Sequence, residues 1–312
     1  MSELSGKKIL VTGASGVMGQ ALVEELRERN FTDVTAIASK EANLLKEQTV
    51  HDLFAHVKPD LVFHLAARVS GIMGNLRNRA AAFTDNARMN INVIDAAVQN
   101  GVTKFVAMGT TAIYSDTIAL PMKEDDLWQG APHGSEAPYG HAKRAMLAQL
   151  EACREHYGLQ YAYCISTNLY GPHDKFDEQY GHVLPSLISK FHRAVTTGSQ
   201  VEVWGTGAAQ RDFLFAKDAA KALILSAESG EGPINVASGN PISIRETAET
   251  IADVVGYKQP IIWDETKPNG QMLRDYDITK LLGLGFKPQI SFREGVRQTY
   301  NWYAENFPNV RR

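Results

Sequence analysis

Short apolar runs alternate with longer amphipathic stretches over the first half of the chain. Continuous apolar runs of this length are typical of buried parallel strands, and the amphipathic stretches have the period of helices that cover a sheet. The expected strands are Lys8–Thr12, Val34–Ala38, Leu61–Ala67, Lys104–Met108 and Gln160–Ile165, and the expected helices run from the first glycine-rich segment to Arg29, from Ala80 to Asn100 and from Arg144 to Tyr157. This alternation predicts an α/β protein with a doubly wound parallel sheet.

A glycine-rich turn follows the first expected strand and opens the first helix. Its glycines, Gly13, Gly16 and Gly19, are spaced as a dinucleotide site requires. The first permits the tight turn, the second lets the backbone approach a pyrophosphate, and the third lets the helix pack on the strand. A glycine-rich turn without a ligand is the alternative. The strand-turn-helix placement favours a Rossmann-type dinucleotide-binding domain.

The pattern becomes richer in loops near Gly171, where helices at His182–Thr197 and Ser243–Val255 and a strand at Glu202–Trp204 are expected. We find no internal repeat, low-complexity tract or flexible linker. Residues 1–170 are therefore expected to form the dinucleotide-binding domain. Residues 171–312 are expected to form mainly a smaller α/β substrate-binding lobe, with some segments returning to the first domain.

The end of the second expected strand indicates which dinucleotide binds. An NAD site usually carries an acidic residue there to hold the ribose 2′-hydroxyl. Here Ser39 and Lys40 occupy the position and Glu41 comes only after them. A hydroxyl and an ammonium suit a 2′-phosphate, so we expect NADP(H). A solvated loop lysine is the alternative reading of Lys40.

The candidate chemistry lies at Tyr139 and Lys143, four residues apart at the start of a helical run. Side chains at this spacing share one helix face, and a nearby ammonium would lower the pKa of a phenol and make it a usable acid or base. A solvated helix face with no chemistry is the alternative. Thr110 and Thr111 follow an expected strand, so their hydroxyls are expected at the ligand edge of the sheet.

Composition limits the classes of function. The 312 residues are 44% hydrophobic and 21% charged, as in ordinary soluble proteins, and the net charge of −3 argues against nucleic-acid binding. The two cysteines, Cys153 and Cys164, have no metal-ligand spacing and suggest a reducing compartment. We see no signal peptide and no apolar run long enough to span a membrane. A cytoplasmic protein without a metal is expected.

Further motifs then carry a resemblance that runs essentially from Lys8 to Phe307. They are Arg211–Phe213, Thr167–Asp174, His182–Pro185, Val203–Gly207 and Thr266–Gly270. With the glycine turn and the Tyr139/Lys143 pair, the chain resembles the extended short-chain dehydrogenase/reductase superfamily. Within its nucleotide-sugar epimerase/dehydratase branch, it is most similar to the GDP-L-fucose synthase family of epimerase/reductases.

The resemblance implies a role for each matching residue. Thr110, Tyr139 and Lys143 would form the hydroxyl-Tyr-Lys triad, with threonine where the family usually has serine, and His182 would be the epimerase histidine. The implied cofactor contacts are Gly13, Ser15, Gly16, Val17, Met18, Gly19, Ser39, Lys40, Asn43, Leu44, Leu65, Ala66, Ala67, Thr110, Tyr139, Lys143, Thr167, Asn168, Leu169 and His182. The implied contacts to the GDP-sugar are Lys190, Trp204, Arg211 and Asn269, against the alternatives of a core tryptophan and surface cations.

Two positions depart from the family. The epimerase cysteine, two residues after the triad hydroxyl, is Ala112, and the usual aspartate is Asn269. Inverting a carbon beside a ketone needs a base on one face and an acid on the other, and alanine supplies neither. Thr111 and Ser115 lie nearby, but an unactivated hydroxyl is a poor base.

We therefore expect an NADPH-dependent reductase of the C4 ketone of a GDP-4-keto-6-deoxy sugar, with doubtful epimerase activity and a homodimeric state. A pure C4 reductase of another nucleotide sugar, such as a GDP-6-deoxy-heptose, is the first alternative. The others are an NAD-dependent sugar-nucleotide 4-epimerase or dehydrogenase and a non-catalytic dinucleotide-binding protein.

Overall fold

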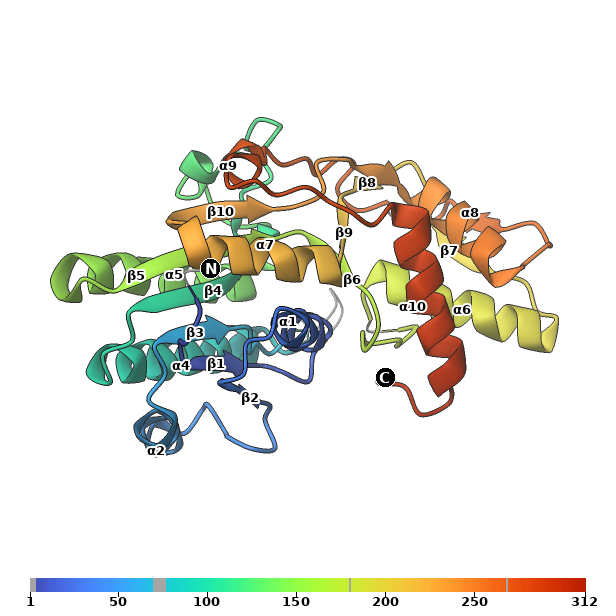
Figure 1. The fold of residues 1–312 in the computed structure, drawn as a ribbon. Coiled ribbons are helices and arrows are strands. Elements are labelled where there is room, and N and C mark those ends of the chain that lie inside the picture. The colour runs from blue at the N-terminus through green and yellow to red at the C-terminus, as the bar shows by residue number, and fades with distance from the viewer. Residues whose placement is uncertain (1–3, 70–76, 180, 268) are drawn as a thin grey trace.

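The structure is a computed structural model that describes residues 4–69, 77–179, 181–267 and 269–312 (Figure 1). Its largest element is a six-stranded sheet in the order β10-β5-β4-β3-β1-β2, with every neighbouring pair parallel. The strands are β1 (Ile9–Thr12), β2 (Val34–Ile37), β3 (Leu61–His64), β4 (Lys104–Thr110), β5 (Gln160–Ser166) and β10 (Gly232–Val236). The helices that pack on the sheet are α1 (Val17–Glu28), α2 (Glu47–Val57), α4 (Arg79–Gln99), α5 (Ala137–Tyr157) and α7 (Ala216–Ser229). The predicted Rossmann-type doubly wound sheet is confirmed.

The sheet reverses its winding direction at β1. Thr12 at the end of β1 pairs with Ile37 of β2 on one side and with His64 of β3 on the other. In open α/β sheets, ligands bind outside the carboxyl ends of the strands where the order reverses. The glycine turn after β1 and the residues after β3 lie at this edge.

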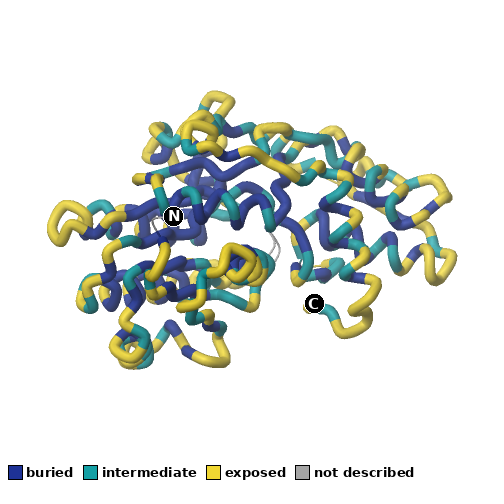
Figure 2. Tube along the Cα trace, in the orientation of Figure 1, coloured by how far each residue is buried: buried dark blue, intermediate teal, exposed yellow. Residues whose placement is uncertain are grey.

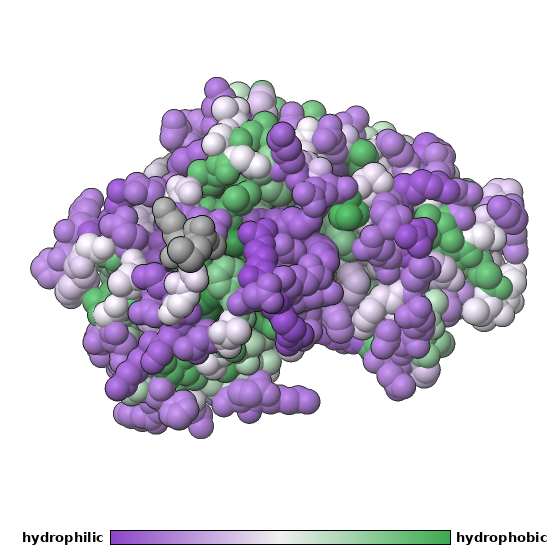
Figure 3. All heavy atoms as spheres, in the orientation of Figure 1, coloured by the Kyte–Doolittle hydropathy of each residue, from purple (hydrophilic) through white to green (hydrophobic). Residues whose placement is uncertain are grey.

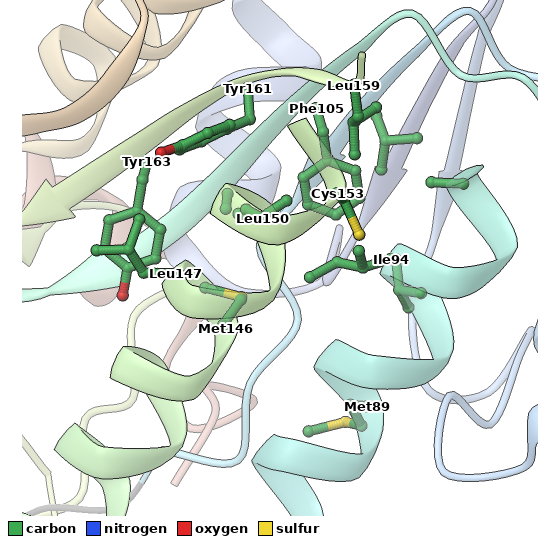
Figure 4. Close-up of a cluster of buried hydrophobic side chains, with 14 of the residues drawn as sticks. Met89, Ile94, Phe105, Met146, Leu147, Leu150, Cys153, Leu159, Tyr161 and Tyr163 are labelled. Atoms are coloured by element: carbon green, nitrogen blue, oxygen red, sulfur yellow. The ribbon is translucent and has the colours of Figure 1, made fainter. Parts of the chain in front are cut away.

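Alternating side chains of the strands bury two hydrophobic layers, one on each face of the sheet. Leu10, Val62 and Phe105 pack against α2, α4 and α5. Their neighbours Ile9 and Phe63 point to the other face and pack against α1 and α7. Figure 4 shows the first layer, with side chains of α4 and α5 meeting those of β4 and β5. Burying each large side chain of this kind contributes roughly 1.5–3 kcal/mol, which fixes both helices on the sheet.

The C-terminal part has a separate core formed by three helices. The remaining elements are η1 (Thr111–Ile113), η2 (Glu124–Asp126), β6 (Asn168–Tyr170), α6 (Val183–Thr197), β7 (Glu202–Trp204), β8 (Gln210–Arg211), β9 (Phe213–Phe215), β11 (Ile242–Ser243), α8 (Ile244–Val255), β12 (Ile262–Asp264), α9 (Thr279–Gly283) and α10 (Phe292–Asn306). Leu187, Ile251 and Val296 bring α6, α8 and α10 together. We call the region built around α6, α8 and α10 the lobe. Figure 1 shows it beside the sheet region, and Figure 2 shows its buried centre.

Several expected element boundaries shift by a few residues. The strand expected over Leu61–Ala67 ends at His64, because Leu65 to Ala67 leave the sheet beside the glycine turn. The strand expected to end at Met108 continues to Thr110. Two elements that follow Gly171 in the chain belong to the sheet region: β10 is a strand of the main sheet, and α7 packs against that sheet.

The surface agrees with the packing of these layers. Figure 3 shows a face covered mainly by hydrophilic residues, with hydrophobic residues in separate patches. Within the described ranges, no helix combines the length and the apolar character needed to cross a membrane.

Candidate active site

The glycine turn leaves no space for side chains at two of its three glycines. Gly13 has a φ of +75°, and a Cβ there would lie 2.7 Å from the Ala66 amide nitrogen. A Cβ on Gly19 would lie 2.3 Å from the Gly13 carbonyl oxygen. A Cβ on Gly16 would have no atom closer than 3.6 Å, so the backbone there is open on one side. The turn is therefore tightly packed at Gly13 and Gly19, while its backbone at Gly16 stays accessible.

The start of α1 fits a bound pyrophosphate. No side chain caps this helix at Gly16, and its first turn carries no acidic residue. The first N–H groups of a helix lack intrahelical acceptors and carry partial positive charge, which phosphate oxygens can satisfy. Ser15 is exposed, Val17 is half-buried, and Met18 is buried under the turn.

Arg311 also reaches this turn from the far end of the chain. Its Nη1 lies 4.0 Å from the position that a Cβ on Gly16 would occupy. Its carbonyl oxygen accepts a hydrogen bond of 2.9 Å from the Phe176 amide, which holds this last segment near the glycine turn. Arg311 was absent from the sequence prediction, because nothing in its local sequence indicates this long-range contact.

The end of β2 places Ser39 and Lys40 on the surface next to the glycine turn. The Ala14 amide donates to the Ile37 carbonyl at 2.9 Å, which joins the turn to this strand. Ser39 and Lys40 are exposed, while the Glu41 carboxylate accepts from the Ala38 amide at 2.8 Å. The acidic group is thus bonded to the local backbone.

The next two predicted cofactor contacts lie in the loop after this strand. Asn43 is exposed and its Oδ1 accepts from the Leu45 amide at 3.1 Å. Leu44 is buried, and its carbonyl accepts from the Asn92 side chain at 2.9 Å.

A chain of buried polar groups connects the glycine turn side of the sheet to α5. Asn90 Oδ1 accepts from His64 Nε2 at 3.1 Å, so His64 Nδ1 accepts from the Thr12 hydroxyl at 2.8 Å. Thr12 Oγ1 in turn accepts from the Ala66 amide at 3.4 Å, and Asn90 Nδ2 donates to the Ala142 carbonyl at 3.5 Å. Burial and the nearby Lys143 lower the pKa of His64 to about 3. The His64 imidazole is therefore neutral, and its hydrogen bond to Thr12 supports the half-buried residues 65–67 through the Ala66 amide.

Tyr139 and Lys143 lie within the first two turns of α5 and are buried, with 9% and 1% exposure. They do not belong to a solvated helix face. Lys143 Nζ donates to the Met108 carbonyl at 2.8 Å and lies 5.9 Å from the centre of the Tyr139 ring. Helix α5 is closely packed against η1, since a Cβ on Gly140 would lie 2.5 Å from the Ala112 carbonyl oxygen.

The expected lowering of the tyrosine pKa is wrong for this structure. Burial raises the pKa of Tyr139 well above its usual range, and Glu136 raises it further. Burial also lowers the pKa of Lys143 to about 7, so the amine carries less charge than an exposed lysine at neutral pH. Sequence spacing indicates that the two side chains are neighbours, but it does not reveal how strongly both are desolvated.

The remaining predicted cofactor contacts lie at the end of β4 and in the segment that follows β5. Thr110 ends β4, and its hydroxyl accepts from the Ala112 amide at 3.2 Å. Thr167 and Asn168 both donate to the Asp212 carbonyl at 3.0 Å, and Leu169 packs on the sheet core. These contacts fix β6 beside β9 at the ligand edge.

His182 lies at the start of α6 and is exposed. Near it is Asp174, a buried carboxylate whose Oδ1 accepts from the Lys175 amide at 2.7 Å and whose Oδ2 has no partner in the part of the chain that the structure describes. Burial raises the pKa of Asp174 to about 6, opposed by His182 and Arg311.

The predicted substrate residues lie on the lobe. Trp204 is 57% exposed with Lys267 Nζ 5.9 Å from its ring, so it is a surface side chain and not a core one. Lys190 is half-buried and donates to the Glu202 carbonyl at 3.4 Å. Asn269 Oδ1 accepts from the Thr206 amide at 2.8 Å and from its hydroxyl at 3.1 Å. This amide therefore joins two loops beside Trp204.

Arg211 is half-buried on β8, and its Nη1 donates to the Gln271 carbonyl at 2.6 Å. The segment of Gln271 also carries Arg274, which forms an ion pair of 2.8 Å with Glu136 at the start of α5. Neither Arg274 nor Glu136 was predicted from the sequence, because their pairing depends on how the lobe meets the sheet region.

Comparison with known proteins identifies the family. The model of the NAD dependent epimerase/dehydratase family matches residues 9–237. The chain belongs to this family. It is 36% identical to GDP-L-fucose synthase of Escherichia coli K12, with 97% of this chain and 98% of that one covered. The predicted resemblance to this family is confirmed.

Solved structures give the same result. A GDP-L-fucose synthetase from Naegleria fowleri bound to NADP is 30% identical, has a TM-score of 0.92, and is matched over 100% of this chain and 97% of its own. A GDP-6-OMe-4-keto-L-xylo-heptose reductase from C. jejuni is 27% identical with a TM-score of 0.91, over 98% and 100% of the two chains.

Proposed function

We propose that the protein reduces the C4 ketone of a GDP-linked 4-keto sugar, with NADPH as the hydride donor. The observation that carries the proposal is the buried Tyr139/Lys143 pair on α5, at the strand edge that also holds the glycine turn. The relatives named above support the GDP-sugar class and the NADP cofactor.

Tyr139 acts as the proton donor. When bound, NADPH supplies the hydride, and negative charge develops on the sugar O4. Because burial raises the pKa of the Tyr139 hydroxyl, the hydroxyl stays protonated at neutral pH and can donate its proton to that oxygen. A strongly raised pKa is compatible with the reductive direction, in which the acceptor is an alkoxide.

Lys143 holds the cofactor ribose beside Tyr139. Its amine is buried and already bound to the Met108 carbonyl, which fixes the direction of the remaining N–H bonds. Ser39 and Lys40 receive the 2′-phosphate, and the uncapped start of α1 receives the pyrophosphate. Exposed Lys40 supports NADP and argues against the NAD-dependent alternative.

The lobe binds the GDP part of the substrate. Exposed Trp204 offers a flat apolar face for the base, while Lys190 and Arg211 attract the diphosphate. Asn269 contributes by holding the loop of Thr206 next to Trp204.

We propose that C3 or C5 epimerisation is weak or absent. Ala112 is buried with 4% exposure and carries no group that could exchange a proton. Incubation of a 4-keto substrate in deuterated water tests this point. Rapid exchange at both carbons that disappears in His182→Ala would contradict it.

A C4 reductase of a heptose, supplied with an already epimerised substrate, is the second candidate. It is favoured by Ala112 together with the fold shared with the C. jejuni heptose reductase. Product analysis by NMR, with NADPH and a panel of GDP-4-keto hexoses and heptoses, distinguishes the two candidates.

Tyr139→Phe tests the mechanism. We expect kcat to fall on the order of a thousandfold, because the proton donor is lost, while the Kd of NADPH stays within about twofold. The Kd is measured by NADPH fluorescence. Unchanged turnover would remove Tyr139 from the mechanism. A parent protein that binds both NADPH and a GDP-4-keto sugar but never turns over would instead support the non-catalytic dinucleotide-binding alternative.

We also propose a homodimer formed through α4 and α5. Phe83 and Ile91 on α4 are 42% and 49% exposed, beside an apolar groove of about 280 Å³ that Ile91, Ala145 and Met146 line. Light scattering of Ile91→Glu tests the dimer, with a monomer mass as the expected result.

The two free, buried cysteines are compatible with the cytoplasm as the compartment of the protein.

A further inference from the structure

Glu136 occupies the start of the catalytic helix and pairs with an arginine from the lobe. It is the N-cap residue of α5 and precedes Tyr139 by three residues. Its Oε2 accepts from Arg274 Nη2 at 2.8 Å, and the side chains are only 25% and 15% exposed. A pair with so little exposure is less screened by solvent than a surface ion pair.

The segment that carries Arg274 connects the two regions of the molecule. On the lobe side, the Gln210 amide donates to the Met272 carbonyl at 2.8 Å. On the sheet side, the Met122 amide donates to the Asp275 carbonyl at 2.9 Å, and the Asp277 amide donates to the Met122 carbonyl at 2.9 Å. Arg274 is thus held from both ends while its guanidinium faces α5.

Arg211 and Arg274 share partners within this segment. Arg211 donates to the carbonyl of Gln271, and Arg274 donates to the side chain of the same residue. Burial lowers the pKa of Arg211, the positive charge of Arg274 lowers it further, and Tyr276 and Glu136 oppose this effect. The predicted diphosphate-binding arginine is therefore linked through Gln271 and Arg274 to the helix of Tyr139.

We propose that the Glu136–Arg274 ion pair is a positioning device, in which Arg274 neutralises the carboxylate beside Tyr139 so that the hydroxyl can release its proton to the substrate. This inference rests on the proposed ketone reduction. An uncompensated carboxylate at this place would oppose formation of the phenolate, because like charges in a buried site repel strongly.

The groups around Tyr139 define what else can affect its ionisation. On α5 these are Glu136 and Lys143, and on β5 the hydroxyl of Tyr163 interacts with that of Tyr139. From the lobe side, Arg274 and Arg211 act on Glu136. Changing Arg274 alone thus alters the charge balance of Glu136 and leaves Lys143 and Tyr163 in place.

The test compares kcat for Arg274→Gln, Glu136→Gln and the double variant. In Arg274→Gln we expect kcat to fall on the order of tenfold, because the unpaired carboxylate disfavours release of the Tyr139 proton. In Glu136→Gln kcat stays within about twofold of the parent. The double variant restores kcat to near the parent value, although it also lacks the ion pair, so a merely structural role for the pair predicts no such rescue.

Two controls separate this role from structural damage and from failure of the proposed function. Arg297→Gln, which breaks an exposed ion pair on α10, leaves kcat unchanged. NADPH fluorescence titration shows that each variant remains folded at its cofactor site. If the parent reduces the ketone but Arg274→Gln leaves kcat unchanged, or if Glu136→Gln does not rescue Arg274→Gln, the inference is overturned. If the parent does not reduce any GDP-4-keto sugar, the proposed function itself fails.

Discussion

In the sheet region, several of the proposed cofactor-site residues follow directly after strands, and the backbone there is tightly packed. Gly13, Thr110 and Thr167 all come within one residue of a strand end, and two glycines permit contacts that no side chain could share. In the lobe, Asn269, Arg211 and Arg274 lie on loops or short strands and are fixed by side-chain bonds to other loops. The proposed cofactor site is thus determined by topology, whereas the proposed substrate site is determined by individual cross-links. Substitutions in the two regions should therefore have different consequences.

Gly19→Ala should have the largest effect, because its Cβ would lie 2.3 Å from the Gly13 carbonyl oxygen. We expect the free energy of unfolding to fall by about 2–3 kcal/mol and the Kd of NADPH to rise on the order of a hundredfold. Thermal unfolding and fluorescence titration measure these quantities. Gly283→Ala is the matched control, since a Cβ there meets no atom within 4 Å. Normal NADPH affinity in Gly19→Ala would show that the turn is not the cofactor site.

The pH dependence of stability should reveal the buried amine of the sheet region. Burial lowers the pKa of Lys143 from about 10.5, the value of an exposed lysine, to about 7 in the folded protein, so the unfolded chain binds more protons between these values. The cofactor-free protein should therefore gain about 2 kcal/mol of stability between pH 7 and pH 9. Urea unfolding at several pH values measures this gain.

Lys143→Met should remove most of that pH dependence. Tyr139→Phe keeps the amine and should retain it. A slope that survives in Lys143→Met would assign the gain to another group.

The smallest expected effect concerns a lobe cross-link. In Asn269→Ala the Thr206 amide and hydroxyl lose their acceptor, which costs about 1 kcal/mol locally. We expect KM for the GDP-sugar to rise about fivefold, with no change in the Kd of NADPH. Asn269→Asp keeps an acceptor oxygen and should stay within about twofold of the parent. Equal increases in both variants would instead indicate direct contact of the amide with substrate.

The same contrast explains what the sequence could predict. The glycine turn and the Tyr139/Lys143 pair are short motifs whose geometry follows from local spacing, so their placement at one sheet edge was predictable. The ion pair of Glu136 with Arg274, the contact of Arg311 with the glycine turn and the His64 bridge join residues that are distant in the chain. Their positions depend on packing between elements, which spacing does not encode.

The wrong expectation for Tyr139 has a related cause. Spacing placed a cation near the phenol, but the outcome was decided by desolvation, which lowers the charge of the lysine and raises the pKa of the tyrosine. Burial of this kind depends on the close packing of α5 against η1.

The two cysteines offer a practical opportunity for studying motion. Cys153 and Cys164 are both buried, and burial raises the pKa of Cys164 to about 11, so thiol-directed dyes have little native background to react with. Exposed residues on the two regions, such as Glu47 on α2 and Glu265 on the lobe, could be replaced through Glu47→Cys and Glu265→Cys. Energy transfer between two attached dyes would then follow the separation of the regions as each ligand is added.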